Sequence, residues 1–373
     1  MVALLLAMTV MVQDSGAFVV RLGSDTLSLE QYKRTATQIR GEYVIRAPRS
    51  VHRIYTADLN SDGTIRRVEV ITHNIGGGPG PMETKLTIEF VGDTSVWTIP
   101  RGDSTVTQKI AAPRGTLPYQ IHVYGLIEQY GRWARATGKD SAAFTALGSA
   151  NQSSGGYVKK LGGDTLRLMF TGGQLAGLGP FTFVLDRQGR LTWLTGKGST
   201  VQVDVQRVPS VPMAQAGPMF ANRPLGQLSP RDTARGTIGG ADVWIDYSRP
   251  SRRGREIFGA LEPWDKVWRT GANAATQFNT PVDLVIGGAT VPAGKYTLWT
   301  LPSQRGWKLI INKQTGQWGA GAASYDPAQD LVQVDAKVET LATPVETFTI
   351  AIEPTALTFA WDKYRYSVPV SKK

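Results

Sequence analysis

Residues able to bind a ligand gather in the second half of the chain, where Arg and Trp side chains are dense between residues 247 and 273. Arg guanidinium groups hold carboxylate or phosphate through paired hydrogen bonds, and Trp faces stack on sugar rings or cations. This composition predicts a site for a small anionic or carbohydrate ligand. The candidate ligand-binding residues are Arg249, Arg255, Trp264, Trp268, Arg269 and Asn273.

The same residues also have a purely structural interpretation. Seven of the ten Trp follow residue 240, as expected if they fill the core of a β-sandwich while the Arg residues cover a solvated loop. Arg269 would then pair inside the fold with Asp246 or Asp265. In contrast, Trp264 and Trp268 lie in loop-like rather than strand-like sequence, which favours the ligand-binding interpretation.

Residues 58–69 match the acidic pattern of a calcium-binding loop, D-x-[DN]-x-[DN]-G-x5-E. The candidate metal ligands are Asp58, Asn60, Asp62 and Glu69. The segments on both sides are strand-like, whereas an EF-hand needs helices, and two Arg within the loop would repel a cation. We therefore expect a hairpin turn and no cofactor, with Ca²⁺ as the alternative.

Motif spacing assigns no catalytic residue. The His residues of the chain, His52, His73 and His122, all lie in its first half, and the chain has no Cys. The second half therefore has no Ser-His or Cys-His pair of its own, and neither a G-x-S-x-G elbow nor a G-x4-G-K-[ST] loop occurs. One alternative function is a hydrolase of an envelope or extracellular polymer. Its site would lie between the domains, where His122 or His73 could meet carboxylates of the second half.

The net charge of +11 suggests an anionic partner. Basic residues are spread along strand-like segments without a run of five, so we do not expect a nucleic acid. A further alternative is a scaffold or interaction module held to anionic envelope surfaces. No apolar run reaches the roughly 18 residues that a membrane-spanning helix needs, so we expect no transmembrane segment.

The start of the chain has the composition of an export signal. Residues 2–12 form a mostly apolar run of eleven residues, the length of a signal-peptide core. A charged segment before the run and a clean cleavage site after it are both missing. We interpret residues 1–12 as a truncated signal peptide and expect an exported protein of the periplasm or cell envelope. A buried first strand is the alternative.

The remaining sequence predicts a mainly β fold in two domains. Residues 13–207 alternate like antiparallel strands, with one helix near 118–137 where apolar residues recur at helical spacing. Residues 208–228 are rich in Pro, Ala and Gly and are interpreted as a linker with at most one short helix. Residues 229–373 alternate again, with one apolar face per strand, and predict an antiparallel β-sandwich.

Several segments of the second half resemble the bacterial domain-of-unknown-function family 2911 over about residues 229–370. The resemblance rests on Tyr247-Ser248-Arg249-Pro250, Gly254-Arg255-Glu256-Ile257-Phe258-Gly259, Val267–Thr276, Pro292-Ala293-Gly294-Lys295-Tyr296 and Gln317-Trp318-Gly319. The W-R-T-G-A-N stretch of the family corresponds to Trp268–Asn273. The resemblance implies a bacterial, usually exported protein. It implies no established activity and therefore no catalytic residue.

Overall fold

The computed structural model describes residues 14–373 except 78–80, 121, 151, 173–174, 176–177, 198–200 and 320–323. The segment interpreted as an export signal lies outside the described residues. The chain divides into two compact units. Unit 1 comprises residues up to Leu22 and Thr26–Gly226, and unit 2 comprises Gly23–Asp25 and Gln227–Lys373. Both units are built mainly from antiparallel strands, which confirms the predicted fold class.

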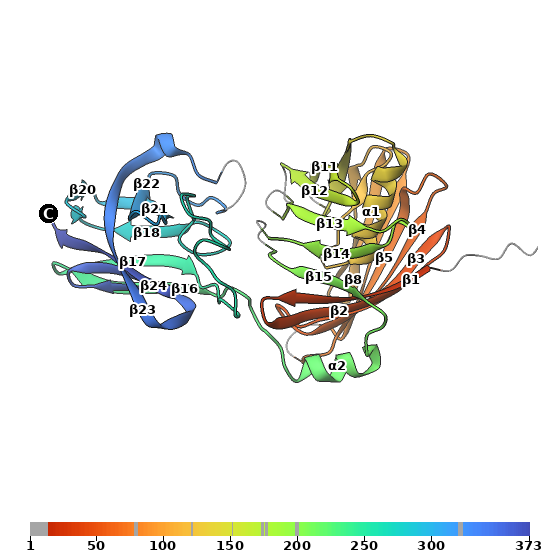
Figure 1. Ribbon diagram of the computed structural model, residues 1–373, viewed down its shortest axis with the longest axis horizontal. Helices are drawn as coiled ribbons and strands as arrows, with labels where there is room; N and C mark the ends of the chain where they lie inside the picture. The colour runs from red at the N-terminus through yellow and green to blue at the C-terminus, as the bar shows by residue number, and fades with distance from the viewer. Residues whose placement is uncertain are drawn as a thin grey trace, which may run out of the picture. The chain divides into compact units, whose positions relative to one another are not determined.

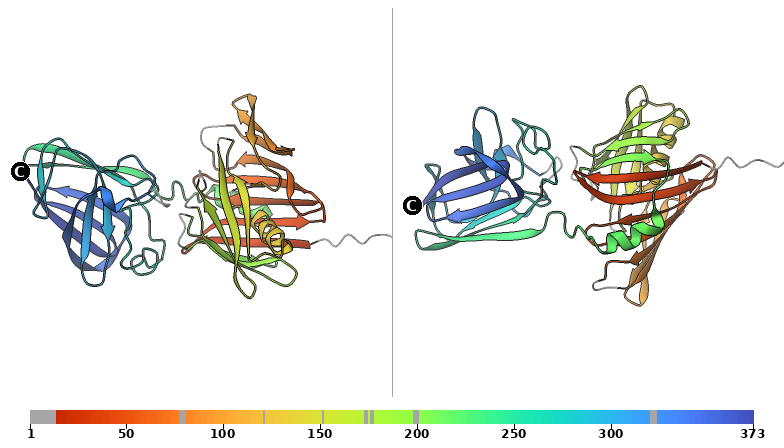
Figure 2. Two further views of the ribbon diagram at one scale, coloured as in Figure 1. Left: turned by 90° about the horizontal axis from the view of Figure 1, so that it is seen from above. Right: turned by 60° about the horizontal axis from the view of Figure 1, so that its bottom comes forward.

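Unit 1 is one sheet that curls back on itself, so that its two halves face each other (Figures 1 and 2). Its described strands follow the order β8-β7-β6-β5-β4-β3-β2-β1-β15-β14-β13-β12-β11-β10-β9. Most neighbours along the chain pair antiparallel, β9 pairs parallel with β10, and β1 pairs with β15 to join the two halves. The strands are β1 (Asp14–Leu22), β2 (Asp25–Arg34), β3 (Gln38–Ile45), β4 (Val51–Leu59), β5 (Ile65–Asn74), β6 (Glu83–Val91), β7 (Thr94–Arg101), β8 (Ser104–Ala111), β9 (Leu117–Pro118), β10 (Ser141–Leu147), β11 (Ser153–Gly162), β12 (Thr165–Thr171), β13 (Phe181–Leu185), β14 (Leu191–Thr195) and β15 (Asp204–Val208).

Helix α1 (Tyr124–Ala136) lies between the two halves of this sheet (Figure 2). It begins later than the predicted residue 118 because Leu117–Pro118 form β9, which pairs with β10. No side chain of its own N-terminal residues caps the helix. Instead, the buried Glu30 of β2 accepts the Tyr124 and Gly125 N–H groups at 2.8 and 3.0 Å. A carboxylate there satisfies free N–H groups and complements the positive end of the helix dipole.

Helix α2 (Met213–Ala221) lies inside the segment interpreted as a linker. Its buried Ala216 and Phe220 pack with Val211 against Leu29 of β2 and Val44 of β3. The backbone carbonyl of Phe220 also accepts a hydrogen bond from the Ser50 hydroxyl at 2.7 Å. Residues up to 226 therefore belong to unit 1, because α2 covers apolar positions on the outer face of its sheet.

Unit 2 is a nine-stranded sheet folded over one large core, in the described order β16-β17-β18-β21-β22-β23-β24-β19-β20. The two longest strands change register between Thr340 and Thr349, where the ribbon bends. The strands are β16 (Arg231–Ile238), β17 (Ala241–Ser248), β18 (Thr276–Thr280), β19 (Leu284–Ile286), β20 (Ala289–Val291), β21 (Gly294–Leu301), β22 (Trp307–Asn312), β23 (Asp330–Glu353) and β24 (Ala356–Lys372), with one 3-10 turn at Pro327–Gln329.

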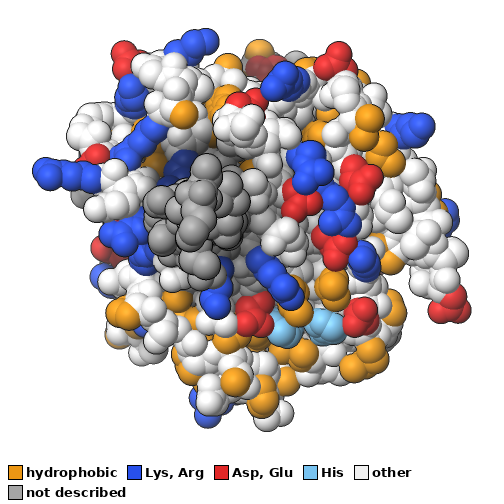
Figure 3. All heavy atoms as spheres, turned by 90° about the vertical axis from the view of Figure 1, so that its right-hand side faces the viewer, with side chains coloured by type: hydrophobic (Ala, Val, Ile, Leu, Met, Phe, Trp, Pro, Cys, Tyr) orange, Lys and Arg blue, Asp and Glu red, His pale blue; other side chains and the backbone are white. Residues whose placement is uncertain are grey.

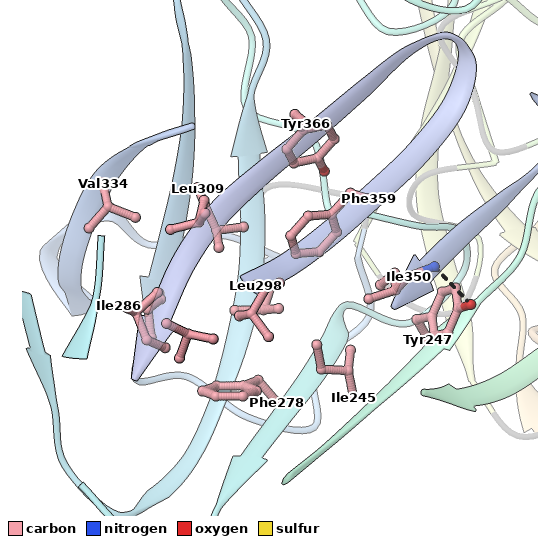
Figure 4. Packing of buried hydrophobic residues seen from close by; sticks show 14 of the residues in the cluster. Ile245, Tyr247, Phe278, Ile286, Leu298, Leu309, Val334, Ile350, Phe359 and Tyr366 are labelled. Carbon is pink, nitrogen blue, oxygen red and sulfur yellow. Dashed lines mark hydrogen bonds between the residues drawn. The ribbon is translucent and has the colours of Figure 1, made fainter. Parts of the chain in front are cut away.

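The core of unit 2 is formed by the apolar faces that the sequence alternation predicts (Figure 4). Ile245 and Phe278 lie near Leu298 in the group drawn in Figure 4. Tyr247 accepts a hydrogen bond from the Ile350 backbone N–H at 3.0 Å, which ties β17 to β23. In the described part of the chain, no helix is long and apolar enough to cross a membrane.

Candidate functional site

The Trp268–Asn273 segment forms a loop before β18 with an unusual backbone. Thr270 and Asn273 adopt left-handed conformations with φ of +52° and +61°. For a β-branched residue such as Thr this conformation is strained, and such strain persists only where the surroundings enforce it. Strained backbone of this kind concentrates at binding and catalytic sites, so the loop is a candidate functional site.

Buried hydroxyl groups hold Thr270 in this conformation. Its Oγ1 lies 2.7 Å from the Thr300 Oγ1, which in turn lies 2.7 Å from the Tyr366 hydroxyl. The Thr276 hydroxyl donates to the Thr270 carbonyl at 2.7 Å. Burial raises the pKa of Tyr366, so this hydroxyl stays protonated and available for hydrogen bonding. The loop is therefore anchored to β21 and β24 through hydrogen bonds rather than by apolar packing alone.

The two Trp residues of the predicted site stand in the aromatic core. Trp268 is 2% exposed, donates its indole N–H to the Gly271 carbonyl at 3.1 Å, and stacks on Trp361 with 5.6 Å between ring centroids. Trp264 is partly buried and packs against Phe258. A Cβ on Gly259 would lie 2.4 Å from the Trp264 indole nitrogen, so this glycine is needed for the packing. These Trp residues thus support the loop from the core side.

Arg249 and Arg255 brace the segment before the loop. The Arg249 guanidinium contacts Asp232 at 3.1 Å, the Phe348 carbonyl at 3.2 Å and the Thr349 hydroxyl at 3.0 Å. Arg255 donates to the carbonyls of Arg252 and Ser251 at 2.8 and 2.6 Å, and burial lowers its pKa to about 10. Both guanidinium groups are engaged within the fold, so we assign them a positioning role.

Arg269 has a different environment. Its Nη1 donates to the Gly319 carbonyl at 3.3 Å, while its buried Nε has no hydrogen-bond partner among the described residues. Burial lowers its pKa, and the charge of Glu262 acts in the opposite direction. Neither Asp246 nor Asp265 forms a salt bridge with it within the described structure. Asp246 instead accepts a hydrogen bond from the Thr233 hydroxyl.

Glu262 is a member of this site that the sequence analysis missed. Burial raises its pKa to about 7, although Arg269 and Arg255 both act to lower it. A carboxyl group with this pKa changes protonation state near neutral pH. Because its charge interacts with that of Arg269, it can balance the guanidinium when ionised, and when protonated it can donate a hydrogen bond. In the sequence, neither the spacing of Glu262 from other polar residues nor its immediate neighbours distinguished it from other acidic residues.

The segment 317–319 completes the site and was also missed, although it formed part of the family resemblance. The Gly319 N–H donates to the Asn273 carbonyl at 2.9 Å, and a Cβ on Gly319 would lie 2.2 Å from Cδ of Arg269. The buried Oε1 of Gln317 has no hydrogen-bond partner among the described residues. Trp318 is 51% exposed. The arrangement offers a guanidinium group, an amide oxygen and an exposed aromatic ring on neighbouring residues.

The calcium-like residues form the turn between β4 and β5. Asp62 Oδ1 accepts the Thr64 N–H at 2.9 Å and the Thr64 hydroxyl at 2.6 Å, so it closes the turn itself. The other carboxylates face cations or donors: Asp58 accepts from Gln38 at 2.9 Å, and Glu69 lies 2.6 Å from Arg67 and 3.0 Å from Lys85. Asn60 Nδ2 donates to the Thr64 hydroxyl at 2.9 Å. No group of three or more metal-binding side chains converges in the described residues.

The His residues lie in two different environments. His52 and His73 are cross-strand neighbours on β4 and β5, paired with Glu42 at 2.7 Å and Glu83 at 3.4 Å. Figure 3 shows His side chains side by side among acidic side chains on this face. His122 is partly buried, with Nδ1 3.3 Å from the Tyr124 hydroxyl. Burial lowers its pKa to about 4, so it stays neutral at ordinary pH.

A pair of buried carboxylates in unit 1 is saturated by the fold. Glu128 of α1 is 0% exposed and is bound by the Tyr32 hydroxyl at 2.6 Å, the Leu191 N–H at 2.7 Å and Arg207 at 3.2 Å. Glu30 is equally buried, and burial raises its pKa to about 7 against the opposing effect of its hydrogen bonds. These groups hold α1 inside the sheet, because buried charges are tolerated only when paired and hydrogen-bonded.

Comparison with known families gives a match for unit 2. Residues 229–370 match the family model described as "Protein of unknown function (DUF2911)". This confirms the resemblance predicted from the Trp268–Asn273 segment and its companions. A search of curated proteins gave no match.

Two solved structures are similar to part of the chain. A duf1089 family protein from Pseudomonas aeruginosa is 15% identical, with 46% of this chain and 90% of that chain covered and a TM-score of 0.32. A β-barrel-like protein of the family DUF1849 from Brucella abortus is 10% identical, with 52% and 94% covered and a TM-score of 0.35. Scores this low carry no argument about function.

Proposed function

We propose that unit 2 binds a small anionic ligand through Arg269, with Glu262, Asn273, Gln317 and Trp318 around it. The observation that carries the proposal is the environment of the Arg269 guanidinium. It is held in a strained loop with a single carbonyl as its hydrogen-bond partner among the described residues. Unpaired buried donors are rare in folded proteins, and a ligand is one of the reasons for which they are kept.

An anion would satisfy the groups that the fold leaves without partners. A carboxylate or phosphate accepts two parallel hydrogen bonds from a guanidinium, which a backbone carbonyl does not provide. Glu262 can adjust to the added charge, because it changes protonation state near neutral pH. Protonation on ligand binding would remove the repulsion between its carboxylate and the anion.

A carbohydrate is the second candidate, and the exposed Trp318 favours it. A Trp face that is 51% exposed beside polar side chains is suited to stacking on a sugar ring. The side chain of Asn273 is exposed on the same loop and can both donate and accept. An acidic sugar would combine the two candidate ligand types, because its carboxylate would bind Arg269 while its ring stacks on Trp318.

The test is calorimetric titration of the full chain with glucuronate, glucose and inorganic phosphate. Replacing Arg269 with Gln should weaken glucuronate binding by about 2–4 kcal/mol, the usual cost of losing a charge-assisted contact in a desolvated site. The matched control is Arg305→Gln, an exposed position of the same unit. Wild-type protein that binds none of the three probes, or equal binding by Arg269→Gln, would contradict the proposal.

We also propose that the protein works outside the cytoplasm, in the periplasm or cell envelope. The support is the mostly apolar run at residues 2–12, which has the length and composition of a signal-peptide core. N-terminal sequencing of protein isolated from its native host should find a chain that begins near Gln13. Isolation of the protein with Met1 intact would contradict export.

A further inference from the structure

A cavity of about 580 Å³ lies on unit 1, and its lining residues include no candidate site residue of the sequence analysis. Its walls come from strands β1 to β4 and from Pro209-Ser210 after β15. This volume falls in the range of small-molecule sites, roughly 300–1,000 Å³. The polar side chains that line it are Ser15, Gln31, Lys33, Arg40, Glu42 and Ser210.

Two cations stand directly opposite each other at this cavity. Lys33 of β2 and Arg40 of β3 are register partners on adjacent antiparallel strands. Both side chains are exposed and both line the cavity. Like charges in this position repel each other and destabilise a sheet. A compensating interaction is therefore expected at this pair.

No acidic partner within the fold provides that compensation. Neither Lys33 nor Arg40 forms a salt bridge within the described part of the chain, and the segments that are not described contain no Asp or Glu. Glu42 also lines the cavity, but its carboxylate is engaged by Gln31 and His52, each at 2.7 Å. The cavity therefore keeps an excess of positive charge.

Other basic residues of the same sheet face show the contrast. Arg67 lies 2.6 Å from Glu69 and 3.1 Å from Glu89, and Lys85 lies 3.0 Å from Glu69. Figure 3 shows basic and acidic side chains interspersed on this side of the molecule. Arg67 and Lys85 are thus paired with carboxylates, whereas Lys33 and Arg40, at the cavity, form no salt bridge among the described residues.

The strands beneath the cavity are held rigidly from the other side. A Cβ on Gly16 or on Gly41 would lie 2.5 Å from the ring of Tyr32 or from the hydroxyl of Tyr55. Both tyrosines are hydrogen-bonded to buried carboxylates, Tyr32 to Glu128 at 2.6 Å and Tyr55 to Glu30 at 2.7 Å. A site on fixed strands keeps its geometry before the ligand arrives, which lowers the entropic cost of binding.

We propose that this cavity binds a small organic anion, with its carboxylate or phosphate group between Lys33 and Arg40. The rest of the ligand would lie along the apolar side chains of Ala17, Ile54 and Pro209. The ligand class is therefore a compact amphipathic anion. This site is separate from the one proposed around Arg269, since all of its lining residues belong to unit 1.

The experiment is titration of the full chain with hexanoate, acetate and inorganic phosphate. Hexanoate should bind more tightly than acetate, because only hexanoate can cover the apolar wall. Lys33→Gln and Arg40→Gln should each weaken hexanoate binding at least tenfold. Lys85→Gln is the matched control, because this cation is exposed on the same face, is paired with Glu69 and lies outside the cavity.

Two further measurements distinguish binding at this cavity from binding at Arg269 and from a general loss of stability. Without ligand, Arg40→Gln should hold or raise the melting temperature at low salt, because it removes a like-charge pair. Repeating the three titrations in the Arg269→Gln background removes anion binding at Arg269, so failure at one site is distinguishable from failure at the other. The proposal is overturned if the wild type binds no probe or if the Lys33 and Arg40 variants bind as the wild type does. Phosphate binding without preference for hexanoate over acetate would overturn the amphipathic ligand class.

Discussion

Arg269 and Trp268 are adjacent in the sequence and have opposite roles in the structure. Trp268 buries its ring and satisfies its single donor within the loop, so its contribution is complete without a ligand. Arg269 keeps a buried donor without a partner among the described residues, and its charge is opposed only by a carboxyl group that titrates near neutral pH. Residue type alone could not separate these roles, because both residues are common in cores and in binding sites.

Substitutions at Asn273 test the left-handed backbone of the loop. Asn273→Gly should change the free energy of unfolding by less than about 0.5 kcal/mol, because glycine adopts positive φ freely. Asn273→Ala should cost about 1 kcal/mol, because alanine lacks the short polar side chain that lets Asn adopt the left-handed conformation. Chemical denaturation of both variants measures the difference. Equal stability of the Ala and Gly variants would show that the loop does not hold this conformation in solution.

At the scale of elements, α1 owes its position to polar contacts as much as to its apolar residues. Helix positions from Tyr124 to Gly131 are buried, including Glu128 and Gln129. The sheet supplies the partners that these polar groups need, among them Arg207 of β15. The helix and the curled sheet are therefore mutually dependent, since either one alone would leave buried charges without partners.

Glu30→Gln tests this dependence at the start of α1. The carboxylate accepts from Tyr124 N–H, Gly125 N–H and the Tyr55 hydroxyl. An amide would present N–H groups to at least one of these donors, so we expect a loss of about 2–3 kcal/mol of unfolding free energy. Tyr55→Phe is the control and should cost less, because it removes one donor and leaves the helix cap. If chemical denaturation gave the same free energy of unfolding for Glu30→Gln and the wild type, the cap would contribute nothing to stability.

At the scale of the whole molecule, each unit contains a glutamate whose pKa burial raises to about 7, Glu30 in unit 1 and Glu262 in unit 2. Their unfolded value is near 4.5. Between pH 4.5 and 7 the folded chain therefore binds more protons than the unfolded chain. Stability from these groups is highest below pH 4.5 and falls as the pH rises to about 7.

Melting temperatures at pH 5 and pH 8 check this behaviour. The melting temperature of the wild type should fall from pH 5 to pH 8. This fall should be smaller in Glu262→Gln, because the neutral amide cannot titrate. Glu256→Gln is the control, since this Glu is exposed in the same segment. An unchanged drop in Glu262→Gln would mean that Glu262 titrates alike in the folded and unfolded chain.

The sequence by itself determined the mainly β architecture, the existence of a helix near 118–137 and the resemblance of residues 229–370 to a known family. These features follow from local patterns: alternation with period two produces strands, and apolar spacing of three and four produces a helix. The later start of α1 and the packing of residues 211–220 on unit 1 depended on strand pairing that no local pattern encodes.

Only the tertiary structure decided which candidate residues remain available to a ligand. Arg249 and Trp268 are engaged because distant segments, such as Phe348 and Trp361, meet them in the fold. The charge of Glu262 and the carbonyl of Gly319 act on Arg269 for the same reason, since the fold brings separate parts of the chain to it. The excess charge of Lys33 and Arg40 likewise depends on strand register, because it places two cations face to face that are seven residues apart in the sequence. Burial and pairing are properties of three-dimensional neighbours, and the sequence supplies only the candidates.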